Sequence, residues 1–461
     1  MGTNNPARIT NKVIVKGRLV LQSPLLIGGG DDRTKQNEAD IHVMKDADGC
    51  PFIPGTSIAG VLRAGWKDEK GHLSASVLFG STEKNQITEE GSQSMVVVRD
   101  ILLKGAEVIV RDGVRINTET GTAEAGAKYD YEVVEKDADG DFYMEITVRQ
   151  QSDHEFPNWK EDVKALIGRL AAGFSLGAMT TKGLGNVVCK SIKMRYFDFS
   201  KSDDVKDYLV GGEDATGKNW EVYQKETSEE SAEISKTFSI DADFILRTSL
   251  LVKGGDPEDY DANAAALRSG DDFVIPGTTI KGVLRHRAER IFKILGKDKH
   301  QLDLLMGYSE EKSRQKSRFL VDEVYIHESA IKPYIQTRNK IDRFTGGTMD
   351  GALLTEQILY HKGQTEEPYV HMHIKIQNPE EWEMGLALFL LRDLWTGDLP
   401  LGGEKSIGRG RLQGKRAVIR SKDEVWELSN NGNISKGDQE ILELYAMALS
   451  SDLKDEAKSN E

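Results

Sequence analysis

The feature that most constrains the fold of this chain is a sequence block that occurs twice. Residues 52–63, FIPGTSIAGVLR, return as residues 274–285, VIPGTTIKGVLR, at an offset of about 222. Three further blocks recur in the same order at offsets of about 222 to 225. Four colinear matches at a nearly constant offset predict a duplicated domain rather than a short-period solenoid.

Length agrees with two copies of one domain, because 461 residues suffice for two or three domains. We place the first domain at 1–198, a polar linker at 199–236, the second domain at 237–420, and a C-terminal helix and tail at 421–461. The 45 glycines indicate many turns, or loops that approach a ligand closely.

The predicted elements follow the same order in both copies. Each copy begins with a strand rich in β-branched residues, followed by a glycine-rich loop, a helix and a second strand. A long excursion, a third strand, a second helix, a glycine loop and a last strand complete it. This β-α-β-β-α-β order is that of the ferredoxin-like fold, which carries RNA on its sheet in RRM domains. The expected class is α+β with two tandem ferredoxin-like domains, and the excursions fall at about 115–135 and 336–360.

Charge and cysteine content exclude several classes of protein. With 61 basic and 75 acidic residues, the net charge of −14 argues against a protein that coats nucleic acid with its whole surface. A local basic groove stays compatible with this balance. Two cysteines fit a reducing, cytosolic compartment. No apolar run is long enough to span a bilayer, so we expect a cytoplasmic chain that is neither exported nor membrane-bound.

Two motifs combine glycine with basic residues, as backbone cradles for anions do. After Ile-Pro-Gly, the N-terminus of a helix offers free N–H groups, with basic side chains close by. In the closing loops, 177–185 and 402–410, glycines flank basic residues. The structural alternatives are a capped turn and a glycine C-cap. The candidate phosphate ligands are Arg63, Lys281, Arg285, Lys182, Lys405 and Arg409.

The excursion of the second copy adds an aromatic residue to a basic segment. Its sequence, QTRNKIDRFTGG, interleaves Arg338, Lys340 and Arg343 with Phe344. Such a segment suits a nucleic-acid strand, with the phenylalanine stacking on bases or wedging between them. The first copy lacks the Arg-Phe pair, so a solvated hairpin is an alternative there.

Acidic residues follow the first strand in both copies. An aspartate beside an RNA backbone could orient or deprotonate a ribose 2′-OH, or hold a divalent ion, although a single loop aspartate usually serves solubility. Equivalence of position favours Asp40 in the first copy and Asp261 in the second, with Asp259 and Asp256 as rivals.

Together these residues resemble the RAMP superfamily, and specifically the repeated backbone subunit of type III CRISPR effector complexes. The likeness rests on SPLLIGG at 23–29, the two Ile-Pro-Gly blocks, IDRFTG at 341–346 and the closing loops, and it covers nearly the whole chain. It implies a fusion of two such subunits. Subunits of this kind stack along a CRISPR guide RNA and push a β-hairpin thumb through the guide–target duplex, and the excursions correspond to the thumbs.

The resemblance also implies an endoribonuclease activity. In active members an aspartate between the first strand and the Ile-Pro-Gly helix cleaves single-stranded target RNA through metal-dependent attack by the adjacent 2′-OH. The family pattern places this residue on Asp40, which would also hold the divalent ion, Mg²⁺ or Mn²⁺, with no organic cofactor. The pattern is broken in the second copy, where Asp261 is our choice.

The implied partners are the guide RNA, the target RNA, other RAMP subunits and the large polymerase-like subunit of the complex. Two alternatives stay open. One is a catalytically inactive RNA-binding scaffold in the same complex. The other is a stand-alone RAMP endoribonuclease that processes guide RNA. Such enzymes usually rely on histidine, and neither closing loop contains one.

Overall fold

The computed structural model divides the chain into two compact units, each built around one copy of the repeat. The first unit comprises 1–113, 128–180 and 184–227, and the second comprises 114–127, 181–183 and 228–461. The residues that the structure describes are 7–29, 39–81, 92–117, 120–150, 158–211, 220–224, 237–255, 264–310, 313–363, 367–422 and 424–450.

The first unit contains an antiparallel sheet in the order β10-β9-β1-β7-β3. The first core strand lies between the third and the fourth, which is the ferredoxin-like order predicted from sequence. In β1, Val13 and Val15 enter the core, whereas Ile14 faces the opposite side, as the two-residue period of a strand requires. The strands are β1 (Ile9–Leu21), β3 (Val96–Val98), β7 (Asp139–Arg149), β9 (Asn186–Asp198) and β10 (Glu221–Val222), and β8 (Phe174–Ser175) pairs with β9.

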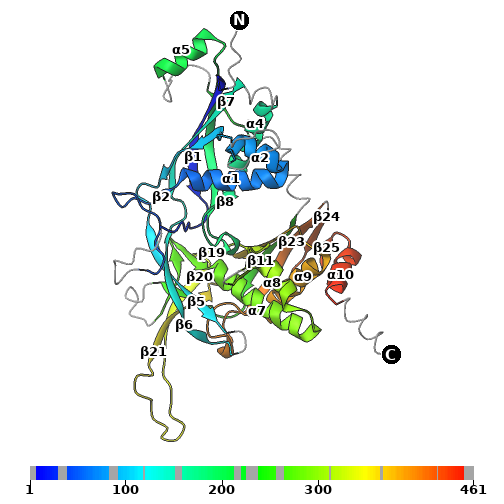
Figure 1. Cartoon of the computed structure of the whole chain (residues 1–461). Coiled ribbons are helices and arrows are strands. Elements are labelled where there is room, and N and C mark those ends of the chain that lie inside the picture. Colours follow the sequence, from blue (N-terminus) through cyan, green and yellow to red (C-terminus); the bar gives the residue numbers. More distant parts are fainter. Residues whose placement is uncertain are drawn as a thin grey trace. The chain divides into compact units, whose positions relative to one another are not determined.

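Helices cover one face of this sheet (Figure 1). They are α1 (Gly55–Lys70), α2 (His72–Phe79) and α4 (Trp159–Ala172). Ile58, Leu62 and Trp66 recur every fourth residue along α1, so they form one buried stripe against the strands.

The opposite face carries an element within the segment predicted as a polar linker, 199–236. Here α5 (Ser202–Gly211) places Tyr208 with its ring centroid 5.4 Å from that of Phe197. Strand β10 lies in the same segment and pairs with β9. The linker prediction is wrong for these residues, because Tyr208 of this polar helix packs, together with Phe199 and Trp220, on the small apolar patch around Ile14.

The second unit repeats the sheet in the order β18-β22-β11-β23-β24-β25. In β11, every second residue from Phe238 to Leu246 is buried. The strands are β11 (Thr237–Leu246), β18 (Phe319–Val321), β22 (Val370–Gln377), β23 (Leu412–Ser421), β24 (Glu424–Leu428) and β25 (Ile434–Lys436). The helices are α7 (Gly277–Leu295), α8 (Lys299–Met306), α9 (Glu381–Trp395) and α10 (Gln439–Ala448).

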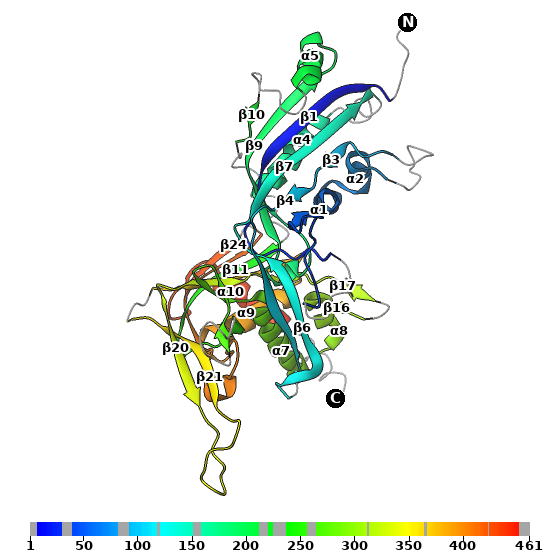
Figure 2. The same ribbon diagram turned by 90° about the vertical axis from the view of Figure 1, so that its left-hand side faces the viewer.

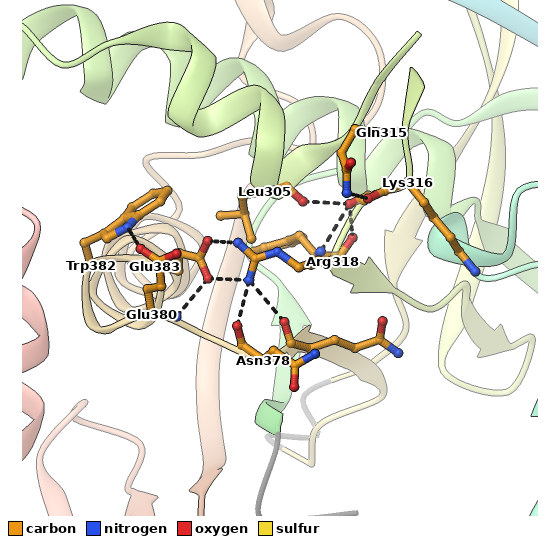
Figure 3. Close-up of polar contacts among 11 residues, drawn as sticks. Leu305, Gln315, Lys316, Arg318, Asn378, Glu380, Trp382 and Glu383 are labelled. Atoms are coloured by element: carbon orange, nitrogen blue, oxygen red, sulfur yellow. Dashed lines mark hydrogen bonds and ion pairs between the residues drawn. The ribbon is translucent and has the colours of Figure 1, made fainter. Parts of the chain in front are cut away.

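An ion pair between the partly exposed Arg318 and a buried carboxylate, Glu383, fixes the start of α9 (Figure 3). The Arg318 guanidinium bonds both carboxylate oxygens of Glu383 and also donates to the carbonyl oxygen of Asn378 at 2.7 Å. Glu383 is fully buried and accepts the backbone N–H of Glu380 at 2.9 Å, which completes a capping box. The network joins the beginning of β18, the end of β22 and the first turn of α9.

A two-stranded hairpin is inserted between the second and third core strands of each copy. The hairpins are β5 (Val108–Ile116) with β6 (Ala123–Val134), and β20 (Ile331–Arg338) with β21 (Leu354–His361). The second projects from the body of its unit (Figure 2). The predicted fold of two ferredoxin-like domains, each with an inserted hairpin, is therefore confirmed. Within the described ranges, no helix is both long and apolar enough to cross a membrane.

Short strands complete the connections near the hairpins. They are β2 (Phe52–Ile53), β4 (Ile101–Leu102), β12 (Lys253–Gly255), β13 (Ala265–Ala266), β14 (Arg268–Ser269), β15 (Asp272–Ile275), β16 (Tyr308–Ser309), β17 (Arg314–Gln315) and β19 (Val324–His327). The pairs are β2 with β4, β12 with β13, β14 and β19 with β15, and β16 with β17.

Candidate functional site

Asp40 lies in the segment between β1 and β2 and is fixed against the base of the first hairpin. Its Oδ2 accepts the backbone N–H of Asp130, on β6, at 3.0 Å. Ile41 forms a parallel bridge with Tyr131, and its carbonyl accepts the N–H of Glu132 at 2.8 Å. Asp40 itself is exposed. The structure therefore presents this carboxylate to solvent at a defined place beside the hairpin.

Two further carboxylates, Asp112 on β5 and Asp130 on β6, belong to the same site. Lys128 Nζ lies 3.3 Å from Asp112 Oδ2 and 3.7 Å from Asp130 Oδ1. Partial burial raises the pKa of Asp130, and the neighbouring Asp112 and Asp40 raise it further, whereas Lys128 lowers it. Three acids beside one lysine leave an excess of negative charge, which favours the arrival of a cation.

The donor set at this site suits a hard divalent cation. Asp130 Oδ1 is inaccessible to solvent and has no hydrogen-bond partner. The described part of the chain contains no group of three or more histidine, cysteine, aspartate or glutamate residues placed to hold a metal ion. Mg²⁺ in nucleic-acid enzymes commonly takes one or two carboxylates and completes its shell with water and phosphate oxygens. Asp40 and Asp130 meet that requirement.

Glu132 holds the residues that follow Asp40, at 43–45, against the hairpin. Its Oε2 accepts the N–H of Val43 at 3.0 Å, and Lys45 Nζ lies 3.3 Å from the same carboxylate. Burial acts to raise the pKa of Glu132, but the Val43 N–H and Lys45 outweigh it, so the net shift is downward. The ionised carboxylate is therefore a structural anchor for the residues that follow Asp40.

Sequence reasoning missed Asp112 and Asp130. Each sits alone in a strand of mixed composition, and only the pairing of β5 with β6 and the bridge to Ile41 bring them to Asp40. Asp130 lies within the predicted excursion at about 115–135, whereas Asp112 lies just before it, so nothing in the sequence indicated that they lie together. The second-copy candidates Asp256, Asp259 and Asp261 lie outside the described residues.

The tip of the second hairpin carries the most accessible of the predicted RNA contacts. Phe344 is 100% exposed, and the side chains of Lys340 and Arg343 are exposed and make no hydrogen bond or ion pair with any described residue. Asp342 shapes the tip, because its Oδ1 accepts the N–H groups of Phe344 at 2.7 Å and Thr345 at 3.2 Å. An aromatic ring and two unpaired cations on one rigid turn suit bases and phosphates.

Arg338 and Arg409 are held in an ion network within the second unit. Arg338 bonds both Glu356 and Glu404, and Arg409 Nε donates to Glu404 at 2.7 Å. Arg409 is 5% exposed and also donates to Ser249 Oγ at 2.8 Å. These two residues, both predicted to bind RNA, therefore tie the closing loop to the base of the hairpin.

Lys281 and Arg285 are likewise engaged inside the second unit. Lys281 is 5% exposed, donates to the carbonyl of Phe319 at 2.8 Å, and has its pKa lowered to about 7 by burial. Arg285 bonds Asp303 and donates to the carbonyl of Gly307 at 2.7 Å. Both side chains have internal partners that a phosphate would have to displace.

The Ile-Pro-Gly turn of the first copy is also satisfied internally. The N–H of Gly55 donates to Asp100 Oδ1 at 2.7 Å, so this helix N-terminus already has an anionic partner. Arg63 is half-buried on α1 without a hydrogen bond or ion pair to the described residues, Lys182 is half-buried in its closing loop, and Lys405 is exposed. Arg63 and Lys405 are thus better placed than Lys281 or Arg409 to contact an anion.

Comparison with protein families supports the repeat. The model of the RAMP superfamily matches residues 18–188 and again residues 243–413. The two matches contain both inserted hairpins and, in each copy, the second and third core strands with the helices that cover them. No curated protein matches the chain. Proteins of the matched superfamily are generally CRISPR-associated and bind RNA, and some are endoribonucleases. Since the two matches together span well over half of its length, the chain belongs to the RAMP superfamily.

Proposed function

We propose that the chain is a backbone subunit of a type III CRISPR RNA-guided complex, and that it binds the guide RNA and cleaves target RNA at Asp40. The observation that carries the proposal is the 3.0 Å hydrogen bond from the Asp130 N–H to Asp40 Oδ2. This bond holds an exposed carboxylate at the base of the first hairpin, which we call its foot. A hairpin inserted into a duplex displaces bases, and its foot is where the distorted backbone would pass.

RNA supplies its own nucleophile for the reaction. The 2′-oxygen attacks the adjacent phosphorus as the bond from phosphorus to the 5′-oxygen breaks, which leaves a 2′,3′-cyclic phosphate and a 5′-hydroxyl. Asp40 orients the 2′-OH or accepts its proton, and the departing 5′-oxygen takes a proton from water. A divalent ion bound by Asp40 and Asp130 would offset the charge on the non-bridging phosphate oxygens. The protein's main contribution is alignment of the 2′-oxygen with the scissile bond.

Sequence-independent binding of RNA fits the exposed cations of the second unit. Lys340, Arg343 and Lys405 are exposed, and Phe344 offers a stacking surface. Contacts of this kind fix RNA through phosphates and base faces without reading sequence. The net charge of −14 is compatible with this role if the acidic residues lie on the outer surface of an assembly.

The proposal includes further partners and a place of action. Other RAMP subunits and a large polymerase-like subunit would flank the chain along the guide, in the cytoplasm. The divalent ion would be Mg²⁺ or Mn²⁺. An inactive scaffold and a stand-alone guide-processing endoribonuclease are the alternatives that the following experiment separates.

The test uses the reconstituted complex with a guide and a 5′-labelled target RNA. Asp40→Asn removes the charge and the basic oxygen but keeps the size of the side chain, so the cleavage rate should fall about 100-fold or more while target affinity is unchanged. The matched control is Asp48→Asn, at an exposed aspartate of the same connecting segment. Products should end in 2′,3′-cyclic phosphate and 5′-hydroxyl.

Three results would count against this assignment. Undiminished cleavage in Asp40→Asn would remove Asp40 from the reaction. Target binding without any cleavage by the wild-type complex would support the scaffold. Cleavage of a guide precursor by the isolated chain would support the processing enzyme.

A further inference from the structure

The feet of the two hairpins, around Glu132 in the first unit and Gln357 in the second, can be aligned residue by residue. Equivalent hydrogen bonds give the alignment. In the first unit, the Glu132 N–H donates to the Ile41 carbonyl at 2.8 Å; in the second, the Gln357 N–H donates to the Ala264 carbonyl at 2.9 Å. The side chains repeat the match, since Val43 donates to Glu132 at 3.0 Å and Ala266 donates to Gln357 at 3.1 Å.

The strand bridges agree with this alignment. Ile41 bridges Tyr131 and Ala264 bridges Glu356, both in the parallel sense. The alignment therefore pairs Ile41 with Ala264, and the preceding residues in sequence, Asp40 and Asn263, correspond. Asn263 lies outside the described residues, and Asp261 stands two positions before it in sequence.

At three aligned and described positions, an ionisable residue of the first unit is replaced by a neutral residue in the second. His42 corresponds to Ala265 and Glu132 to Gln357. Asp130 corresponds to Thr355, which faces Thr337 across the hairpin, with their hydroxyls 3.2 Å apart. The Thr337–Thr355 pair thus stands where the first unit has Asp130. An amide or hydroxyl carries no charge and is a poor base at neutral pH, so these groups cannot repeat the chemistry proposed for Asp40.

The acid that does lie at this foot is already neutralised. Glu356 is 1% exposed, bonds the Arg338 guanidinium and lies 2.8 Å from Lys253 Nζ. Its counterpart in the first unit is Tyr131. The second foot therefore uses its carboxylate to hold structure together, whereas at the first foot Asp40 is exposed and Asp130 Oδ1 accepts no hydrogen bond.

We infer that the cleavage chemistry is confined to the first domain, and that the second domain holds and splays RNA without cutting it. Each copy of this chain then makes one cut in the target RNA, although it carries two hairpins. The inference rests on the proposed function. It assigns no catalytic part to Asp256, Asp259 or Asp261.

The first test maps cleavage sites on a labelled target with three complexes: wild type, Asp40→Asn, and the triple variant Asp256→Asn, Asp259→Asn, Asp261→Asn. Asp40→Asn should remove every cut assigned to this chain, and the triple variant should cut at the wild-type positions and rates. The inference is overturned if a second set of cuts survives Asp40→Asn and disappears in the triple variant. If every cut survives in both variants, the proposed function itself fails.

The second test does not depend on activity. Fe²⁺ with ascorbate and peroxide, added to the RNA-loaded complex, generates hydroxyl radicals that break the polypeptide beside a bound ion. Fragments should end near Asp40 and Asp130, and Asp40→Asn should abolish them. Fragments ending near Ala264 or Thr355 would contradict a single site, and the absence of fragments near Asp40 would contradict an ion held by the first domain.

Discussion

The ion pair between Arg318 and Glu383 offers a sharp test of how the second unit is held together. We consider Arg318→Met, which keeps much of the apolar length of the side chain and removes its charge. In the wild type, Glu383 is fully buried, and the guanidinium bonds it and the carbonyl of Asn378 (Figure 3). The substitution leaves a buried carboxylate without its cation.

The expected cost follows from the remaining partners of Glu383. Removing one partner of a buried ion pair typically costs about 3–5 kcal/mol. The Glu380 N–H still donates to Glu383 at 2.9 Å, so we place the cost at the lower end, about 3 kcal/mol. At about 1.4 kcal/mol per factor of ten, the opening equilibrium of this region should rise roughly 100-fold.

Hydrogen exchange in the full chain measures this opening domain by domain. Peptides from α9 should exchange roughly 100-fold faster in Arg318→Met, while peptides from α4, the corresponding helix of the first unit, should be unchanged. Glu383→Gln keeps an oxygen for Arg318 and should cost only about 1–2 kcal/mol. Unaltered protection of α9 in Arg318→Met would refute the view that this pair anchors the helix.

Three further predictions concern the hairpin tip, pH and a glycine pair. Phe344→Ala should weaken target binding by the guide-loaded complex about 5- to 100-fold through lost stacking, while the urea midpoint stays unchanged because the ring is fully exposed. Burial lowers the pKa of His373, but its hydrogen bond with Asp241 and nearby acids outweigh this and raise it above 6.5. The stability that this pair contributes is therefore complete below that pH and lost as pH rises through the folded pKa, so the gap in urea midpoint between wild type and His373→Gln should shrink as the pH rises above about 6.5. Gly55→Ala should destabilise the first unit by about 1–3 kcal/mol, because a methyl group there meets the Val98 carbonyl. The control Gly60→Ala, in open space on the same helix, should stabilise by about 0.5–1 kcal/mol, and equal unfolding midpoints for the two variants would contradict this reasoning.

The core of each domain was predictable because its signals are local and repeated. The alternation in β11 and the four-residue spacing in α1 each specify an element and its buried face. Elements that are held in place by only a few tertiary contacts show no such periodic pattern in the sequence. The helix α5 is polar apart from residues such as Tyr208, and its place on the sheet depends on Phe197, which is close in sequence but lies on a different element.

One residue of the candidate site, Asp40, could be proposed from the sequence, whereas its acidic neighbours could not. Asp40 follows a strand in a motif with fixed spacing, whereas Asp130 joins it only through the pairing of the hairpin with the Asp40 segment. Basic residues posed the opposite problem. From the sequence, Arg338 and Arg409 were both predicted to bind RNA, but the side chain that engages both, Glu404, lies in the closing loop and is recognised as their partner only in three dimensions.

The closing glycines show why a residue shared by the two copies points to folding rather than to RNA. Gly185 and Gly410 have φ of 77° and 79°, and a methyl group at either would overlap the carbonyl oxygen of Leu176 or of Leu401. Both copies keep these glycines because the backbone there packs on itself. The hairpin feet are where the copies differ in charge while their backbone hydrogen bonds match. Chemistry that only one copy performs should therefore lie at the feet, and the acids beside Asp40 are present in one copy alone among the described residues.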